Sequence, residues 1–285
     1  MFSNFYPHNF RVFEMEKVAY VGIDIGGSHI SVGFVDSDGN VLSKSETHLD
    51  NFSVLPHDLV ALITEHISEN KPANFRLAAI GVGIPGQSKA NVLVAASNLP
   101  NFKNVPLAAM ISERNNNIPV LLLNDADAAI CAEVWGKESR LYYESKSNIA
   151  LITLGTGIGL GLILNNTLHQ GSNGLVEGGH MIVSNKASSR KCGCGQIGCV
   201  EAYSSAKNTA LRLHEMDDSE SSSTDKKKKK NTAAEEEEAV EHVVMMGSKE
   251  VFERFTMNDF NAVKVVEEVR TQSRPLMRCW CLFPL

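Results

Sequence analysis

The sequence predicts an α/β fold in which two similar lobes enclose a cleft, and two observations carry this prediction. An apolar strand, a glycine-rich turn, a second strand and a hairpin occur in VAYVGIDIGGSHISVGFVDSDGNVL and again in NIALITLGTGIGLGLILNNTLHQG. Such a repeated unit indicates a duplicated architecture. Between the repeats, strand patterns alternate with helical patterns, which favours a partly parallel sheet. We expect lobes over 18–123 and 124–270, a leader over 1–17 and an atypical tail over 271–285.

Apolar periodicity and turn residues define the elements of the first lobe. The first repeat predicts three strands, the last two joined by a hairpin through Ser37–Asn40. An amphipathic helix is predicted over 55–71, with Pro56 suited to its first turn. Two apolar strands, in RLAAIGVGIPG and IPVLLLNDADAA, come next, and the second enters a helix that continues to about Glu138. Five residues of the amphipathic helix should share one face, namely Leu55, Leu59, Leu62, Ile63 and Ile67.

Composition and charge argue against several classes of protein. With 285 residues, 43% of them hydrophobic, the chain can build one large core or two moderate ones. Its net charge of −6 gives no electrostatic basis for binding nucleic acid. No apolar run approaches the roughly 20 residues that cross a bilayer, and the start of the chain resembles neither a signal nor a transit peptide. We therefore expect a soluble, cytoplasmic protein that binds neither nucleic acid nor membrane.

One segment departs from this globular composition. Residues 217–238, DDSESSSTDKKKKKNTAAEEEE, are dense in charge and poor in apolar side chains, so they cannot pack a core. We expect a disordered insertion or a fraying helix, and a nuclear-import signal in the lysine run is the alternative. Helical periodicity resumes over 248–270, so the second lobe is expected to continue beyond the insertion.

The stretch GVGIPG matches the dinucleotide-binding pattern G-x-G-x-x-G at Gly81, Gly83 and Gly86. Its context argues against that function. A helix should open at the third glycine, yet Pro85 precedes it and polar residues follow it. No acidic residue stands about 20 positions later to hold a ribose. We expect instead a tight loop that lines the cleft.

Each repeat carries a glycine loop, in GIDIGGSH and in LGTGIGLG. Neither loop contains the Lys of a P-loop, which excludes a Walker-type site. Glycines let backbone N–H groups approach phosphate oxygens closely, so two such loops favour one nucleotide held from both sides; simple hairpin glycines are the alternative. Asp24, just before the first turn, is a candidate for holding hydrated Mg²⁺. The glycines concerned are Gly26, Gly27, Gly155, Gly157 and Gly159.

The pair Asn124-Asp125 follows an apolar strand at its carboxyl end, where open α/β folds place ligands. A carboxylate in that position can accept the proton of a hydroxyl group. An ordinary helix N-cap is the competing interpretation of Asp125.

Three cysteines lie within the eight residues of CGCGQIGC, residues 192–199. In a reducing cytosol, clustered cysteines favour a metal over a disulfide. Cys192, Cys194 and Cys199 supply three thiolates, and His180 supplies a fourth ligand that would close a tetrahedral Zn²⁺ site. A site with four protein ligands is structural rather than catalytic, and free thiols are the alternative.

Together these motifs resemble the ROK family of sugar kinases and repressors, which belongs to the actin and hexokinase (ribonuclease H-like) superfold. DIGGSH, GIPG, NDADAA, GTGIGLG, EGGH and CGCGQIGCVEAY occur in the family's order and approximate spacing. The resemblance covers residues 18–207 and resumes, less specifically, over 248–270. It implies transfer of the γ-phosphoryl group of ATP, with Mg²⁺, to a sugar hydroxyl.

The resemblance implies roles for individual residues. Asp125 matches the general base that takes the proton of the sugar's 6-hydroxyl as this group attacks in line. His180 would use one ring nitrogen for zinc and the other for a sugar hydroxyl, so that the metal orients a substrate contact. The implied sugar-binding residues are Gly86, Asn98, Asn124, Asp125, Glu177, His180 and Glu201. The residues implied for ATP and Mg²⁺ are Asp24, Gly26, Gly27, Ser28, Gly155, Thr156, Gly157 and Gly159.

The run GCVEAYSSA resembles family members that act on glucose, so a glucokinase is the first expectation. Kinases for N-acetylmannosamine, N-acetylglucosamine, fructose or allose remain alternatives. Family members are commonly dimers or tetramers, which implies a homo-oligomer. Repressor members carry an N-terminal helix-turn-helix module, for which the leader leaves no room.

The resemblance ends before the C-terminus. The family continues past the EEVR helix into another helix and a GGG-containing loop on the adenine side of the nucleotide, whereas this chain ends in SRPLMRCWCLFPL. We therefore expect a truncated or altered C-terminus. This keeps open a non-catalytic sugar-binding protein, and a zinc-stapled structural module is a third interpretation that leaves the glycine loops unused.

Overall fold

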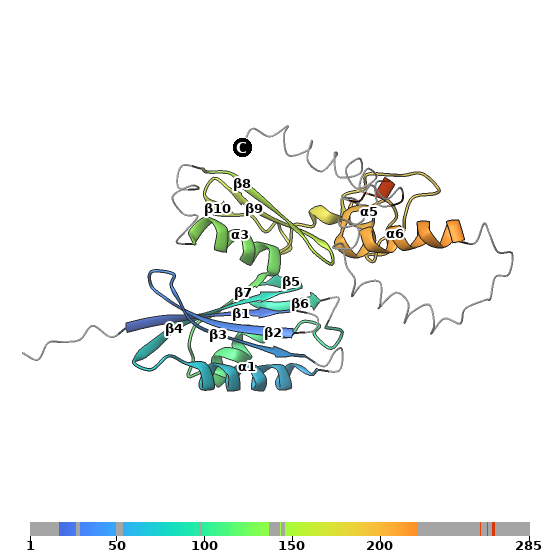
Figure 1. Ribbon diagram of the computed structural model, residues 1–285. Helices are drawn as coiled ribbons and strands as arrows, with labels where there is room; N and C mark the ends of the chain where they lie inside the picture. The colour runs from blue at the N-terminus through green and yellow to red at the C-terminus, as the bar shows by residue number, and fades with distance from the viewer. Residues whose placement is uncertain are drawn as a thin grey trace, which may run out of the picture. The chain divides into compact units, whose positions relative to one another are not determined.

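The computed structural model (Figure 1) describes residues 17–26, 29–49, 54–96, 99–136, 143, 146–221, 257, 261 and 264–265. The chain divides into two compact units, Met1–Asn124 and Asp125–Leu285. The tail predicted over 271–285 and all but the last residue of the leader predicted over 1–17 lie outside the described residues. Within the described residues, every helix is too short or too polar to span a bilayer.

A five-stranded sheet forms the first unit. Its strands are β1 (Lys17–Ile25), β2 (His29–Asp36), β3 (Val41–His48), β4 (Phe75–Ile84) and β7 (Val120–Asn124). They lie in the order β3-β2-β1-β4-β7, with β1, β2 and β3 antiparallel and with β4 and β7 parallel to β1. The predicted hairpin joins β2 to β3, and Gly39 takes a left-handed φ of 83° there, which glycine adopts without strain. The three strands predicted for the first repeat are confirmed.

Two helices, α1 (Pro56–Asn70) and α2 (Leu107–Arg114), bury one face of this sheet in a shared apolar core. Pro56 occupies the first turn of α1 as predicted, because its missing N–H would have no partner at that position. The prediction is wrong for Leu55, which precedes the helix and is 42% exposed, while Val60 faces the core instead. The residues that α1 buries are Leu59, Val60, Ile63 and Ile67, with Leu62 partly buried beside them.

A strand, not a helix, follows the GVGIPG motif. β5 (Gly86–Lys89) pairs with β6 (Val92–Ala96) in antiparallel register. A Cβ atom at Gly86 would overlap the backbone of Ala95 and Ala96, so only glycine permits this pairing. The dinucleotide-binding pattern has a helix at the third glycine, whereas a strand begins at Gly86 here.

The second unit begins with a helix and a three-stranded antiparallel sheet. These elements are α3 (Asp125–Trp135), β8 (Ile149–Leu154), β9 (Ile158–Leu164) and β10 (Thr167–Leu168). Ile130 of α3 packs against Ile149 and Ile163 of the sheet. Asn165 and Asn166 both have positive φ and form the predicted two-residue hairpin between β9 and β10. The arrangement repeats that of β1 to β3, which supports the predicted duplication.

Three further elements follow in the second unit, namely η1 (Gly178–His180), α5 (Glu201–Ser204) and α6 (Ala206–Ser221). α6 extends into the segment predicted as a charged insertion, so residues 217–221 are helical. At the start of this extension, Asn261 Nδ2 donates a hydrogen bond to Asp217 Oδ1 at 3.0 Å. Residues 222–238 lie outside the described residues.

Asp127 is a buried carboxylate in the first turn of α3, with only 1% of its surface exposed. Its Oδ2 accepts a hydrogen bond of 2.9 Å from Nε2 of Gln170, which joins α3 to the loop after β10. Burial raises the pKa of Asp127, the Gln170 hydrogen bond lowers it, and the charge of Asp125 raises it again. The ionised side chain is therefore less favourable in the folded protein than in the unfolded chain.

Replacing Asp127 with asparagine should increase the free energy of unfolding at neutral pH, because the amide keeps an oxygen for Gln170 and removes a buried charge. The folded-state pKa of Asp127 lies above its unfolded value, so its charge destabilises the wild type only as the pH rises through these values. The gain of Asp127→Asn should consequently disappear in acid. Urea unfolding from acid to neutral pH measures it, with the exposed Asp58→Asn in α1 as a control that gains nothing. A loss of stability at neutral pH in Asp127→Asn would contradict the prediction.

Candidate functional site

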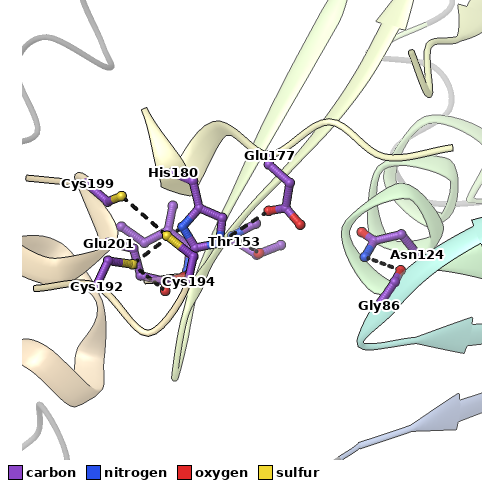
Figure 2. A network of polar contacts seen from close by, with 11 residues as sticks. Gly86, Asn124, Thr153, Glu177, His180, Cys192, Cys194, Cys199 and Glu201 are labelled. Carbon is purple, nitrogen blue, oxygen red and sulfur yellow. Dashed lines mark hydrogen bonds and ion pairs between the residues drawn. The ribbon is translucent and has the colours of Figure 1, made fainter. Parts of the chain in front are cut away.

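The carboxyl ends of three parallel strands gather polar groups at one edge of the sheet in the first unit. The register places Asp24 of β1 beside Gly83 of β4, and Ile84 of β4 beside Asn124 of β7. The Asn124 side chain donates a hydrogen bond from Nδ2 to the carbonyl oxygen of Gly86 at 3.1 Å (Figure 2). Ligands of open α/β sheets bind at this edge. The structure therefore brings three of the predicted site residues to one location within this unit.

The first glycine loop starts at the same edge. The backbone N–H of Gly26 donates to the carbonyl oxygen of His29 at 2.8 Å, which closes a tight turn between β1 and β2. Asp24 is exposed immediately before this turn. Of the other residues predicted for this part of the site, Gly27, Ser28 and Asn98 lie outside the described residues.

The second glycine loop joins β8 to β9 in the other unit. Gly155 and Thr156 are exposed at its tip, where the N–H of Gly155 donates to the carbonyl oxygen of Gly157 at 3.0 Å. Thr153 Oγ1 accepts the N–H of Gly159 at 3.1 Å and so fixes one side of the loop. Thr153 was not predicted as a site residue, although a polar residue near the end of an apolar strand was a visible signal.

The predicted metal ligands converge in the second unit. The ligand atoms of His180, Cys192, Cys194 and Cys199 all lie within 4.8 Å of one another. Sγ of Cys194 lies 3.7 Å from Sγ of Cys199, and Sγ of Cys192 lies 3.5 Å from Nδ1 of His180 (Figure 2). Zn–S bonds of about 2.3 Å and a Zn–N bond of about 2.0 Å at tetrahedral angles place two sulfurs about 3.8 Å apart, and sulfur and nitrogen about 3.5 Å apart. The donor types and these two distances therefore fit a tetrahedral zinc ion.

Tight turns rather than long strands build this Cys/His cluster. The N–H of Gly195 donates to the carbonyl oxygen of Cys192 at 3.0 Å, and the N–H of Cys192 donates to Gln196 at 2.8 Å. Gly195 and Gly198 have positive φ of 90° and 83°. At Gly198 a Cβ atom would also overlap the backbone of Ser184, so this position requires glycine. Gly195 and Gly198 thus permit the turns that bring the three thiols close together.

Burial controls the protonation of the cluster. Cys199 is fully buried and Cys192 nearly so. Removal from water raises the pKa of Cys192 to about 12 and also raises that of Cys199. These residues are neutral thiols unless a cation compensates the thiolate charge, so metal binding must release their protons.

His180 connects the cluster with the carboxylate of Glu177. Its Nδ1 faces Cys192, whereas its Nε2 lies 3.8 Å from Oε2 of Glu177 (Figure 2). When Nδ1 gives its lone pair to a metal, the ring proton resides on Nε2, which becomes a hydrogen-bond donor. A metal in the cluster would therefore determine both the direction and the donor character of Nε2.

Further carboxylates lie near Glu177 in the second unit. Burial raises the pKa of Glu177, His180 lowers it, and the charges of Glu201 and Asp125 raise it further. Asp125 begins α3, and its Oδ1 accepts the N–H of Ala126 at 2.8 Å. The predicted base and three predicted sugar-binding residues therefore occupy one neighbourhood.

The chain is similar to a known protein family and to several of its members. A family model described as the ROK family matches residues 20–273. A glucokinase of Thermotoga maritima is 35% identical over 206 residues, which are 70% of this chain and 60% of that protein. A xylose repressor of Bacillus spizizenii is 32% identical over 197 residues, which are 67% of this chain and 49% of that protein. The chain thus spans about half to three fifths of the length of these two relatives.

A solved structure with the same fold is a ROK family glucokinase from Streptomyces griseus in complex with glucose and AMPPNP. It matches with a TM-score of 0.68 at 25% identity, and the match covers 93% of this chain and 80% of that one. The predicted α/β fold of the actin and hexokinase class is confirmed. The family model covers most of the chain, including both glycine loops and the Cys/His cluster, so this chain belongs to the ROK family.

Proposed function

We propose that the chain is an ATP-dependent sugar kinase that phosphorylates the 6-hydroxyl of a hexose, with glucose as the first candidate. The observation that carries this proposal is the two-sided placement of His180, with Nδ1 at the Cys/His cluster and Nε2 beside Glu177. A nitrogen fixed in this way suits the recognition of a sugar hydroxyl, which both donates and accepts hydrogen bonds. The glucokinase among the relatives and the fold match to a glucokinase solved with glucose and AMPPNP support the same substrates.

Sugar binding is assigned to the polar residues that the sequence predicted for it. In the second unit, the Nε2–H of His180 donates to one hydroxyl, and the carboxylates of Glu177 and Glu201 accept from others. Asn124 contributes its side-chain amide from the first unit, and Gly86 and Asn98 are weaker candidates. Several directed hydrogen bonds of this kind distinguish hexoses that differ at a single hydroxyl.

Asp125 is assigned the role of general base. As the sugar oxygen bonds to the γ-phosphorus, its proton passes to the Asp125 carboxylate, and the bond from that phosphorus to the bridging oxygen breaks to release ADP. Asp24 is the candidate ligand of Mg²⁺, which neutralises phosphate charge when bound. The glycine loops are assigned to the phosphates, with Gly26, Gly27 and Ser28 in the first loop and Gly155, Thr156, Gly157 and Gly159 in the second.

A second candidate function rests on the similarity to the xylose repressor. In a non-catalytic sugar-binding protein, the sugar contacts would persist while nucleotide binding and turnover were lost. N-acetylglucosamine kinases also occur among the relatives, one of them 31% identical over 200 residues. N-acetylmannosamine and fructose therefore stay in the set of sugars to be tested with glucose and N-acetylglucosamine. Assembly as a homo-oligomer and a location in the cytoplasm belong to the same proposal.

Asp125→Asn should lower kcat at least about 100-fold and leave the sugar dissociation constant within about threefold, because the amide keeps the shape of the side chain but cannot take a proton. A coupled ADP-release assay with Mg-ATP and each sugar measures turnover, and calorimetry measures sugar affinity. Asp127→Asn is the matched control, since it makes the same change two residues further along α3 and should keep near-normal turnover. Turnover by Asp125→Asn close to that of the wild type would exclude Asp125 as the base. Sugar binding by the wild type without any turnover would favour the non-catalytic alternative.

Cys194→Ser should lower metal affinity at least about 100-fold and weaken sugar binding with it, because the ring of His180 loses its fixed orientation. Metal content by mass spectrometry and sugar affinity by calorimetry are the two measurements. Cys131→Ser is the matched control, since Cys131 lies in α3 and outside the cluster. Undiminished sugar affinity in metal-free Cys194→Ser would show that the cluster plays no part in substrate binding.

A further inference from the structure

Glu201 lies between the Cys/His cluster and the second glycine loop. Its Oε2 accepts the backbone N–H of Ile158, the first residue of β9 directly after the loop, at 2.9 Å. Its Oε1 lies 3.7 Å from Sγ of Cys192, on the cluster side (Figure 2). Glu201 begins α5 only two residues after the predicted ligand Cys199, so its backbone is tied to the cluster through a short connection. One side chain thus contacts two parts of the site that are distant in sequence.

Packing and backbone hydrogen bonds support this connection. Val200 is fully buried and shares an apolar cluster with Ile158. Beyond α5, the N–H of Ala206 donates to the carbonyl oxygen of Gly155 at 2.8 Å. The segment after Cys199 therefore meets the loop through an apolar contact, a backbone hydrogen bond and the Glu201 carboxylate.

The sequence of the loop accommodates this carboxylate at one glycine. A Cβ atom at Gly157 would lie 2.7 Å from Oε2 of Glu201, closer than real Cβ contacts. A Cβ atom at Gly155 would meet no described atom within 4 Å. Neither glycine has a positive φ, so the two positions differ chiefly in their proximity to Glu201.

We propose that Glu201 is a positioning residue that joins the second glycine loop to the Cys/His cluster, so that a metal in the cluster strengthens nucleotide binding by the loop. The proposal rests on the function assigned above to that loop. A bound metal fixes Cys199 and the start of α5, and the Ile158 hydrogen bond passes this restraint to the loop. A loop that is already ordered loses less conformational entropy when it binds phosphates. Because such coupling is reciprocal, nucleotide should also slow metal loss.

Calorimetry with Mg-AMPPNP tests whether metal binding strengthens nucleotide binding. Sugar is left out because Glu201 is also assigned to sugar binding, and that contact would confuse the result. Stripping metal from the wild type with a chelator should weaken AMPPNP binding about tenfold, the size expected for one hydrogen bond to a charged group. Metal-loaded Glu201→Ala should keep its metal, bind AMPPNP about tenfold more weakly than the wild type, and change less than about twofold on stripping. Glu201→Gln retains an acceptor oxygen and should restore most of the affinity.

Glu215→Ala is the matched control, because Glu215 pairs with Arg190 in the same unit at 2.8 Å and should leave the coupling as in the wild type. Two outcomes would overturn the proposal. In the first, Glu201→Ala would show the same metal dependence of AMPPNP affinity as the wild type. In the second, Glu201→Ala would lose its metal, which would make Glu201 part of the metal site itself.

A second measurement needs no nucleotide. Gly157→Ala displaces the Glu201 carboxylate, so it should speed metal release to a chelator several-fold and accelerate hydrogen exchange in the 155–160 segment, whereas Gly155→Ala should do neither. Equal behaviour of the two variants would overturn the connection. If the metal-loaded wild type binds no AMPPNP, the proposed kinase function fails. The difference between Gly157→Ala and Gly155→Ala in metal release then tests by itself whether Glu201 joins the loop to the cluster.

Discussion

The candidate site depends on one constraint, the tetrahedral arrangement of four ligand atoms in the Cys/His cluster of the second unit. Three thiols and an imidazole share a tetrahedral ion when sulfur and nitrogen atoms lie about 3.5–3.8 Å apart; the distances of 3.5 and 3.7 Å for two pairs have that value, and all four ligand atoms lie within 4.8 Å of one another. The segment that carries the cysteines is held by turns and by isolated bridges such as Ile182 with Cys199. A metal bound there would add order where regular secondary structure adds little, and it would fix the orientation of His180.

The predicted site residues of the first unit are positioned in a different physical way. Backbone pairing alone places Asp24 and Asn124 at the same edge, because β1, β4 and β7 run parallel in register. The apolar core beneath the sheet fixes the strands, and hydrogen bonding between Asn124 and Gly86 then orients the side chain. Ligand groups in this unit thus depend on sheet topology, and those of the second unit depend on coordination chemistry.

Local signals predicted much of this structure. The hairpin at Asn165-Asn166 and the helix that starts at Pro56 each follow from the conformational limits of a few residues. The four ligands of the cluster were also predictable, because their types and their proximity in sequence restrict the chemistry. These features have in common that neighbours along the chain determine them.

Other features depend on contacts between distant residues, which sequence patterns do not reveal. Burial of Asp127 and its hydrogen bond to Gln170 link positions 43 residues apart. Glu201 was predicted as a sugar contact, but its bond to Ile158 spans another 43 residues and gives it a second partner. Thr153 is closer in sequence to its partner: its Oγ1 accepts the N–H of Gly159 across the turn between β8 and β9.

X-ray absorption at the zinc edge of the purified protein, with and without glucose, tests the central claim most directly. A closed site held by the cluster predicts one nitrogen at about 2.0 Å and three sulfurs at about 2.3 Å, unchanged when sugar is added. A shell that contains oxygen, that lacks the nitrogen, or that gains a ligand with glucose would contradict the account. A shell without the nitrogen would mean that His180 is not held by the metal, and a shell with oxygen or an added ligand would mean that the site is not closed.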